Sequence, residues 1–242
     1  MKQLLYNMTD RVYKRIFNID IKNYTKDTLD DLGIFIHFDE TNLLNAKILI
    51  IGPEDTPYEG GYYIYKVRFP GSYPFKPPKV TFCSNSKIRI HPNMYVNGKV
   101  CLSILGTWAG PSWESVMDIN CVAKTIQSLM CKRALQNEPG FLTEEGEPCI
   151  NYDRIISFEN INAYIGNQVQ RAKLDKNSNI ERLYGFHSII LEHFYKNKEE
   201  ILKRIKNNER YICKPEEVNV SVYNIKCDED YKKLFRHIGK IE

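Results

Sequence analysis

A cysteine that follows a turn-rich polar segment is the residue of this sequence best placed to do chemistry. The segment opens with His91-Pro92-Asn93 and closes with Asn97-Gly98, a pair that favours a tight turn, and Cys101 follows shortly after. A packed support beneath the cysteine is predicted by its apolar neighbours, Val100, Leu102, Ile104 and Leu105. A partly exposed thiol with polar neighbours is a plausible nucleophile, because the thiolate is the reactive form.

Two residues of this segment also have a purely structural interpretation. Cys101 could be a small core residue, because unpaired cysteines are among the most buried residue types. Asn93 could simply hold the loop, because asparagine readily bonds nearby backbone groups. Residue types alone leave both alternatives open.

The composition indicates an ordinary globular protein. The chain has 242 residues, of which 43% are hydrophobic and 26% are charged, with a net charge of +4. Such a small excess of basic residues predicts no nucleic-acid surface. We expect no membrane segment, because no apolar run approaches the ~18 residues that a span needs.

The cysteines predict a protein of the cytoplasm or the nucleus. The chain has seven of them, an odd number at irregular spacing and without a CxxC pair. This pattern favours reduced thiols over a disulfide framework. It also lacks the close ligand pairs that are typical of a structural zinc site, so we expect no metal.

Hydrophobic periodicity predicts an N-terminal helix followed by four strands. The helix is capped at Thr9-Asp10 and runs to about residue 18. Four apolar runs follow, at residues 33–38, 43–51, 62–69 and 79–83. Because turn residues separate successive runs, they predict an antiparallel meander.

Helical patterns dominate the rest of the chain. They cover residues 115–130, 151–169, 180–207 and 230–241, with a polar linker at 173–179 and room for a short strand within 210–226. The order of elements predicts an α+β fold. We expect a core domain at residues 1–160 and a mostly helical extension at 161–242 that packs against it.

Several motifs resemble, in type and order, the catalytic core of ubiquitin-conjugating enzymes, the E2 family. They are Tyr73-Pro74-Phe75-Lys76-Pro77-Pro78, His91-Pro92-Asn93, the cysteine eight residues after that asparagine, Leu102-Ser103-Ile104-Leu105, a downstream tryptophan and the helical stretch 125–129. The resemblance covers about residues 9–140 and implies the E2 (UBC) fold. It extends more weakly to the chain end, where it is similar to the larger, C-terminally extended E2s with a Gly-Thr-Trp loop after the cysteine.

The resemblance implies a function for the cysteine segment. Cys101 would accept ubiquitin or a ubiquitin-like protein from an activating enzyme (E1) as a thioester, and pass it to a substrate lysine or a ligase (E3). Asn93 matches the family's oxyanion residue, while His91 and Pro92 would support the loop. The resemblance implies no cofactor, since ATP is used by the activating enzyme and this chain has no glycine-rich phosphate loop.

A further carboxylate is implied by the resemblance at the gate of the site. In many E2s an acidic residue just before a proline lies there, and Glu138 matches it. Such a group could orient the incoming lysine and take its proton. The loop before it is one residue longer than the common form, so Asn137 is the alternative.

Partner contacts are implied at two further places. Lys14 and Arg15 match basic residues of the first helix that help E2s bind activating enzymes and ligases. Phe75 and Trp113 match residues of the ligase-docking loops. The usual Ser-Pro-Ala after the tryptophan is replaced here by residues 114–116, Glu-Ser-Val, so ligase specificity does not carry over.

Two other functions compete with an active E2. One is an inactive E2-like scaffold that binds ubiquitin or a ligase, although such variants typically lack the cysteine. The other is a cysteine hydrolase that pairs Cys101 with His91 or His187, for which the chain has no matching signature. Formation of a thioester distinguishes the first two, and cleavage of a ubiquitin-linked substrate would indicate the third.

Overall fold

The computed structural model describes residues 11–26, 29–178, 185–208 and 216–241. Contacts divide the chain into two compact units that interleave along the sequence. The first unit is drawn from Met1–Pro53, Tyr63–Ser84 and Asn93–Met130, and the second from Glu54–Tyr62, Asn85–Pro92 and Cys131–Glu242. The division into a core and an extension at residue 160 stays a prediction.

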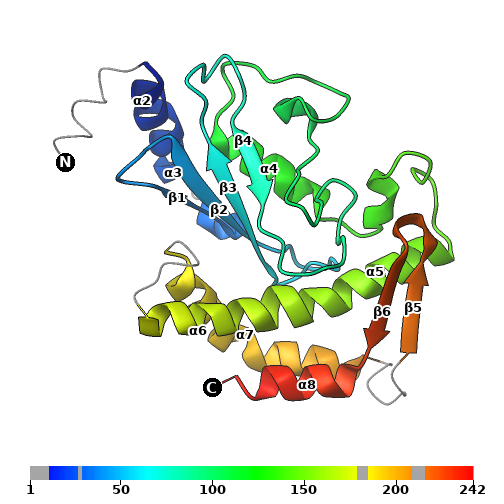
Figure 1. Cartoon of the computed structure of the whole chain (residues 1–242). Helices are drawn as coiled ribbons and strands as arrows, with labels where there is room; N and C mark the ends of the chain where they lie inside the picture. Colours follow the sequence, from blue (N-terminus) through cyan, green and yellow to red (C-terminus); the bar gives the residue numbers. More distant parts are fainter. Residues whose placement is uncertain (1–10, 27–28, 179–184, 209–215, 242) are drawn as a thin grey trace. The chain divides into compact units, whose positions relative to one another are not determined.

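A four-stranded sheet with the order β1-β2-β3-β4 runs through the first unit (Figure 1). Its strands are β1 (Ile34–Phe38), β2 (Asn45–Ile51), β3 (Tyr62–Arg68) and β4 (Lys79–Phe82). β1 runs antiparallel to β2 with Ile34 opposite Ile50, and β3 runs antiparallel to β4 with Arg68 opposite Lys79. The predicted meander is confirmed.

Burial explains why these apolar runs become strands. Ile34, Ile48 and Ile50 are fully buried on the paired strands β1 and β2. In the first half of β3, from Tyr62 to Tyr65, every side chain is buried. Both faces of the sheet are therefore covered there, which a run of large apolar and aromatic residues suits better than strict alternation.

The N-terminal helix extends further than the sequence predicts. It consists of three consecutive segments, α2 (Arg11–Arg15), the π-helical η1 (Ile16–Ile21) and α3 (Lys22–Lys26). The predicted end near residue 18 is wrong because Asp20 is buried and bonded to Tyr73 and to the backbone of Ile119. These contacts keep the second half of the helix in the packed unit. The predicted cap at Thr9-Asp10 lies outside the described residues.

Helix α4 (Ile119–Leu129) begins later than the predicted start at Ser115. Asp118 caps it, because its carboxylate accepts the Cys121 N–H at 3.0 Å. Val116 precedes the cap and is 76% exposed, so it contributes nothing to the buried face. The helix packs against β2.

The second unit consists mostly of helices. They are α5 (Glu147–Glu159), the π-helical η5 (Asn160–Asn167), α6 (Gln168–Ser178), α7 (His187–Asn207) and α8 (Tyr231–Gly239). The first three follow one another without a break, so the predicted linker at 173–179 is wrong as far as Ser178. Buried Val169 and Ala172 anchor this part of the helix, and α6 packs against α7, which also contacts α8 (Figure 1). None of the helices in the described ranges has the length and apolarity needed to cross a membrane.

A β-hairpin interrupts the helices of the second unit. Its strands β5 (Glu216–Val220) and β6 (Ile225–Glu229) are antiparallel, and both pack against α5 (Figure 1). The sequence predicts one short strand here, and the structure has two. A tight turn joins them, in which Tyr223 precedes Asn224 with its positive φ of 51°.

Candidate functional site

A glycine turn positions the segment that leads to Cys101. Gly98 has a φ of +91°, and its carbonyl accepts the N–H of Phe82 on β4 at 2.9 Å. A Cβ at this position would lie 2.8 Å from Thr81 Cγ2, so only glycine fits without a shift of the strand. The tight turn predicted from Asn97-Gly98 is confirmed, and it ties the cysteine segment to the edge of the sheet.

Asn93 and Cys101 bind each other through their backbone and one side chain. The N–H of Cys101 donates to Asn93 O at 2.9 Å, and Asn93 Nδ2 donates to Cys101 O at 2.8 Å. Asn93 is buried, with an exposed fraction of 5%. The amide therefore holds the loop in this structure, which favours the structural interpretation of Asn93. An amide has two N–H donors, so this bond does not exclude a second role.

Thr107 fixes the backbone on both sides of the cysteine. Its hydroxyl accepts the N–H of Leu102 at 2.9 Å and lies within donating distance of Val100 O at 2.8 Å. Gly106, with a φ of +67°, turns the chain so that Thr107 returns to the cysteine. Sequence reasoning missed this residue. The available signal was the Gly-Thr pair after a short apolar run, since threonine hydroxyls often satisfy backbone groups in turns.

The Cys101 thiol itself is buried, with 1% of the residue exposed. Of the two alternatives that the sequence leaves open for Cys101, this structure favours the buried core residue over the partly exposed thiol. The predicted packed support is present, because Val100, Leu102 and Ile104 are also buried. The thiol must therefore become exposed before it can attack an external group. Cys121 and Cys131, by contrast, are exposed.

His91 and Pro92 directly precede Asn93 in the sequence and belong to the second unit. Both are buried, and His91 is completely so. The centroid of the imidazole ring lies 6.0 Å from that of the Tyr58 ring, and the hydroxyl of Tyr58 donates to Ile90 O at 2.8 Å. This packing suits a residue that supports the loop, as predicted, and the role stays a prediction.

The two candidates for the gate residue differ in what they bind within the second unit. Glu138 Oε2 accepts the hydroxyl of Tyr223 at 2.6 Å and lies 3.6 Å from Arg89 Nη2. Asn137 Nδ2 donates to Ala134 O at 3.1 Å, within its own turn. Glu138 is therefore held by residues distant in the sequence, Tyr223 and Arg89, whereas Asn137 bonds the backbone of its own turn.

A comparison of the sequence with models of known protein families identifies the family of this chain. The family model described as "Ubiquitin-conjugating enzyme" matches residues 17–145, more than half of the chain. This chain belongs to the ubiquitin-conjugating enzyme family. The predicted α+β E2 fold, with its mostly helical C-terminal extension, is thereby confirmed together with the sheet and helices described above.

Individual relatives match part of the chain. Human "Ubiquitin-conjugating enzyme E2 Z" is 45% identical over 133 residues, which are 53% of this chain and 37% of the relative. "Probable ubiquitin-conjugating enzyme protein 17" of Caenorhabditis elegans is 36% identical over 179 residues, 71% of this chain and 24% of the relative. The solved structure of human ubiquitin-conjugating enzyme E2 G1 is 31% identical, with a TM-score of 0.41, and the match covers 48% of this chain and 91% of that one. The matched segment spans little more than a third of E2 Z.

The two basic residues that the E2 resemblance selects on the first helix differ in accessibility. Lys14 is exposed, as a partner contact requires. Arg15 turns inward, where its Nη2 donates to Met117 O at 2.7 Å and its Nε lies 3.9 Å from the Asp20 carboxylate. Within this E2, Lys14 is thus the freer of the two to meet a partner.

The two aromatic residues selected as ligase contacts differ in the same way. Phe75 is 61% exposed, and the guanidinium of Arg11 lies 4.7 Å from its ring centroid. Trp113 is half-buried, and its Nε1 donates to Pro74 O at 2.6 Å. Trp113 therefore stabilises the proline-rich loop on which Phe75 is exposed.

Asp20 is a buried carboxylate that sequence reasoning missed. Its Oδ1 accepts the hydroxyl of Tyr73 at 2.5 Å and the N–H of Ile119 at 2.9 Å. Burial raises the pKa of Asp20 to about 6, although these bonds and Arg15 act in the opposite direction. Asp20 joins the first helix, the proline-rich loop and the start of α4.

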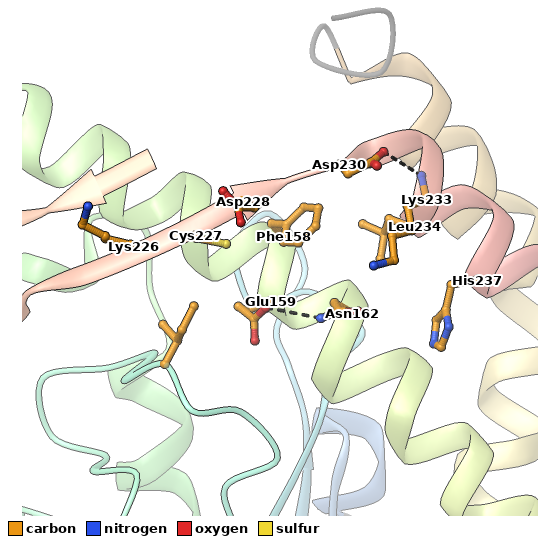
Figure 2. A pocket seen from close by; sticks show the side chains of 11 residues that line it. Phe158, Glu159, Asn162, Lys226, Cys227, Asp228, Asp230, Lys233, Leu234 and His237 are labelled. Atoms are coloured by element: carbon orange, nitrogen blue, oxygen red, sulfur yellow. Dashed lines mark hydrogen bonds between the residues drawn. The ribbon is translucent and has the colours of Figure 1, made fainter. Parts of the chain in front are cut away.

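A pocket of about 470 Å³ lies among α5, β6 and α8 of the second unit (Figure 2). Its charged lining residues are three carboxylates and two lysines, namely Glu159, Asp228, Asp230, Lys226 and Lys233. Glu159 already accepts hydrogen bonds from Ser86 and Asn162.

Across the described residues, no group of three or more His, Cys, Asp or Glu side chains is arranged to hold a metal ion.

Proposed function

We propose that this chain is an active E2 that carries ubiquitin, or a ubiquitin-like protein, as a thioester on Cys101. The proposal rests on the fixed backbone around the cysteine. Asn93 donates a hydrogen bond to the carbonyl of Cys101, and the hydroxyl of Thr107 bonds the backbone of Val100 and Leu102. A nucleophile that must meet a large acyl donor benefits from such positioning, because correct orientation removes part of the entropic barrier. Membership of the family supports the same reaction.

The charging step exchanges one thioester for another. The Cys101 thiolate attacks the carbonyl carbon of the modifier's C-terminal thioester on the activating enzyme. A new C–S bond forms to Cys101, the old C–S bond breaks, and the thiolate of the activating enzyme leaves. The proton lost by Cys101 is balanced by protonation of that leaving thiolate.

The transfer step converts the thioester into an amide. A neutral lysine amine attacks the thioester carbonyl, which passes through a tetrahedral oxyanion before the Cys101 thiolate leaves. Asn93 is our candidate donor for that oxyanion, through its side-chain amide. Donors of this kind contribute roughly 3–4 kcal/mol in other enzymes. Glu138 is our candidate to orient the amine and accept its proton, with Asn137 as the alternative.

The proposed partners follow from this reaction. They are an activating enzyme, a ligase and a substrate lysine, with Lys14 and Phe75 as exposed contact residues. We infer a reducing compartment, the cytoplasm or the nucleus, because none of the six described cysteines forms a disulfide.

One observation favours a second function. Cys101 is almost fully buried, as a cysteine of an E2-like scaffold that binds ubiquitin without charging would be. The two functions are distinguished by incubation with an activating enzyme, ATP and its modifier, followed by a non-reducing gel. An ATP-dependent band that a thiol reagent removes, and that free lysine discharges, supports the transferase. If no such band forms with activating enzymes for ubiquitin or its relatives, the scaffold is the correct function.

A further inference from the structure

Arg89 holds the two carbonyl groups that directly precede Asn93. Its Nη2 donates to Pro92 O, and its Nε donates to His91 O at 3.4 Å. The carbonyl of Pro92 belongs to the peptide group whose N–H is that of Asn93. A planar guanidinium with several fixed donors is suited to hold two acceptors at once. Arg89 therefore fixes the backbone at the entry to the asparagine.

The same guanidinium lies beside the carboxylate of Glu138. Arg89 Nη2 is 3.6 Å from Glu138 Oε2, and both side chains are largely buried. A pair this shielded from solvent interacts more strongly than one on an open surface. The candidate gate carboxylate and the peptide before Asn93 are thus linked through a single side chain.

Tyr223 of the β5–β6 hairpin completes this cluster. Its hydroxyl donates to Glu138 Oε2 at 2.6 Å, and its ring lies under the Arg89 guanidinium, 4.4 Å from ring centroid to Cζ. Hydrogen bonds to a carboxylate are among the stronger ones, and cations are attracted to aromatic faces. Tyr223 thus contacts both members of the ion pair.

The tyrosine is itself held by a buried neighbour. Tyr152 of α5 is completely buried, its ring centroid lies 5.6 Å from that of Tyr223, and its hydroxyl donates to Arg89 O at 2.8 Å. The backbone and the guanidinium of Arg89 are therefore both fixed. A rigid support of this kind sets the direction of the side chains bound to it.

We propose that Tyr223 is a positioning residue for the transfer step, which orients Glu138 and, through Arg89, fixes the peptide group before Asn93. The inference rests on the proposed function of Cys101. It assigns a task to the C-terminal extension: the hairpin would control discharge of the modifier to lysine and leave charging unchanged. Charging needs no amine to be oriented, so it does not need the gate carboxylate.

The test compares two tyrosine-to-phenylalanine variants of the full chain. Tyr223→Phe removes the bond to Glu138 and keeps the ring under Arg89. Tyr62→Phe is the matched control, because it also removes a hydroxyl that bonds a titratable side chain, His193 at 3.0 Å, in the second unit. Each variant is charged, purified as the thioester and discharged with increasing concentrations of free lysine.

We expect Tyr223→Phe to lower the maximal discharge rate roughly fivefold, the effect of losing one orienting hydrogen bond. The charging rate and the lysine concentration at half-maximal rate should stay within about twofold, because neither depends on that bond. Added to Glu138→Ala, Tyr223→Phe should cause no further loss, since the bond is already absent. Unchanged discharge, or losses that multiply in the double variant, would overturn the inference.

Amide hydrogen exchange tests the positioning role of Tyr223 without a measurement of enzyme activity. Tyr223→Ala, which removes the ring under Arg89, should increase deuterium uptake in the peptide that contains residues 89–94, and Tyr223→Phe, which keeps the ring, should increase it less. Equal uptake in Tyr223→Ala and the wild type would contradict the link through Arg89. If the wild-type chain never charges, the proposed function fails, while this exchange measurement still tests whether Tyr223 holds the segment.

Discussion

Asn93 and Cys101 are joined by two hydrogen bonds that run in opposite directions. The N–H of Cys101 donates to Asn93 O at 2.9 Å, and Asn93 Nδ2 donates to Cys101 O at 2.8 Å. Because both residues are buried, neither bond is easily replaced by water. The residue proposed to stabilise the transition state thus also fixes the backbone of the proposed nucleophile.

Replacement of Asn93 by alanine should affect both stability and transfer. The buried Cys101 carbonyl would lose a donor, which is expected to lower the free energy of unfolding by about 1–3 kcal/mol. Discharge to lysine should fall by roughly 10²-fold or more if Asn93 also donates to the oxyanion. Urea denaturation and single-turnover discharge measure the two effects. Asn97→Ala, at an exposed position in the same segment, is the control. Lower stability with normal discharge would limit Asn93 to holding the loop.

Loss of the Thr107 hydroxyl should loosen the backbone around the cysteine. Thr107→Val keeps the shape of the side chain but removes the acceptor for Leu102 N–H and the partner of Val100 O. We expect a loss of about 2 kcal/mol in unfolding free energy, and faster amide exchange at residue 102. Thr107→Ser keeps the hydroxyl and should behave nearly like the wild type. A serine variant as unstable as the valine variant would show that the methyl group, and not the hydroxyl, matters.

An alanine at Gly98 should strain the turn before the cysteine. The residue has a φ of +91°, and the added Cβ would lie 2.8 Å from Thr81 Cγ2 and 3.1 Å from Phe82 O. The expected loss of unfolding free energy is about 1–3 kcal/mol. Gly71→Ala is the control, since no atom lies within 4 Å of its Cβ position. Equal melting temperatures for the two variants would contradict this account of the turn.

The buried Asp20 predicts a specific pH dependence. Its pKa is raised in the folded state from 3.8 to about 6, so folding favours the protonated form. The stability that this preference contributes is complete below the unfolded pKa and is lost as pH rises through the folded pKa. Between pH 4.5 and 7 the loss should amount to roughly 2 kcal/mol, because one pKa unit corresponds to 1.36 kcal/mol.

The Asp20→Asn variant isolates this contribution. Its amide oxygen can still accept the bonds from Tyr73 and Ile119 but does not ionise. Measured by urea denaturation, the variant should therefore gain stability relative to the wild type as pH rises from 4.5 to 7. A constant difference between the two proteins over that range would show that Asp20 is not protonated preferentially in the folded state.

Local patterns allowed the sheet and the cysteine segment to be predicted from the sequence. The four strands follow from apolar runs separated by turn residues, and the Asn93–Cys101 pair joins residues only eight positions apart. Both features depend on interactions within a short stretch of chain. Sequence periodicity and turn chemistry report on such interactions directly.

Contacts between distant segments were not predictable in this way. Tyr223 and Glu138 are 85 residues apart, and Tyr73 and Asp20 are 53 apart. No local pattern indicates which tyrosine meets which carboxylate. Whether Cys101 is buried or partly exposed could not be decided from the sequence for the same reason, since it depends on how completely the surroundings pack. The extent of the N-terminal helix was missed because a buried carboxylate in its second half has its partners on other elements.

The central claim is that Cys101, although buried, is the residue that carries the modifier. The most direct measurement charges Cys101→Ser beside Cys121→Ser and Cys131→Ser, which replace two exposed thiols. The account predicts that both control variants form a band that a thiol reagent removes. Cys101→Ser should instead give no band, or an ester that resists thiol reagents and yields to alkali. A thiol-sensitive band on Cys101→Ser, or its loss from either control, would contradict the account.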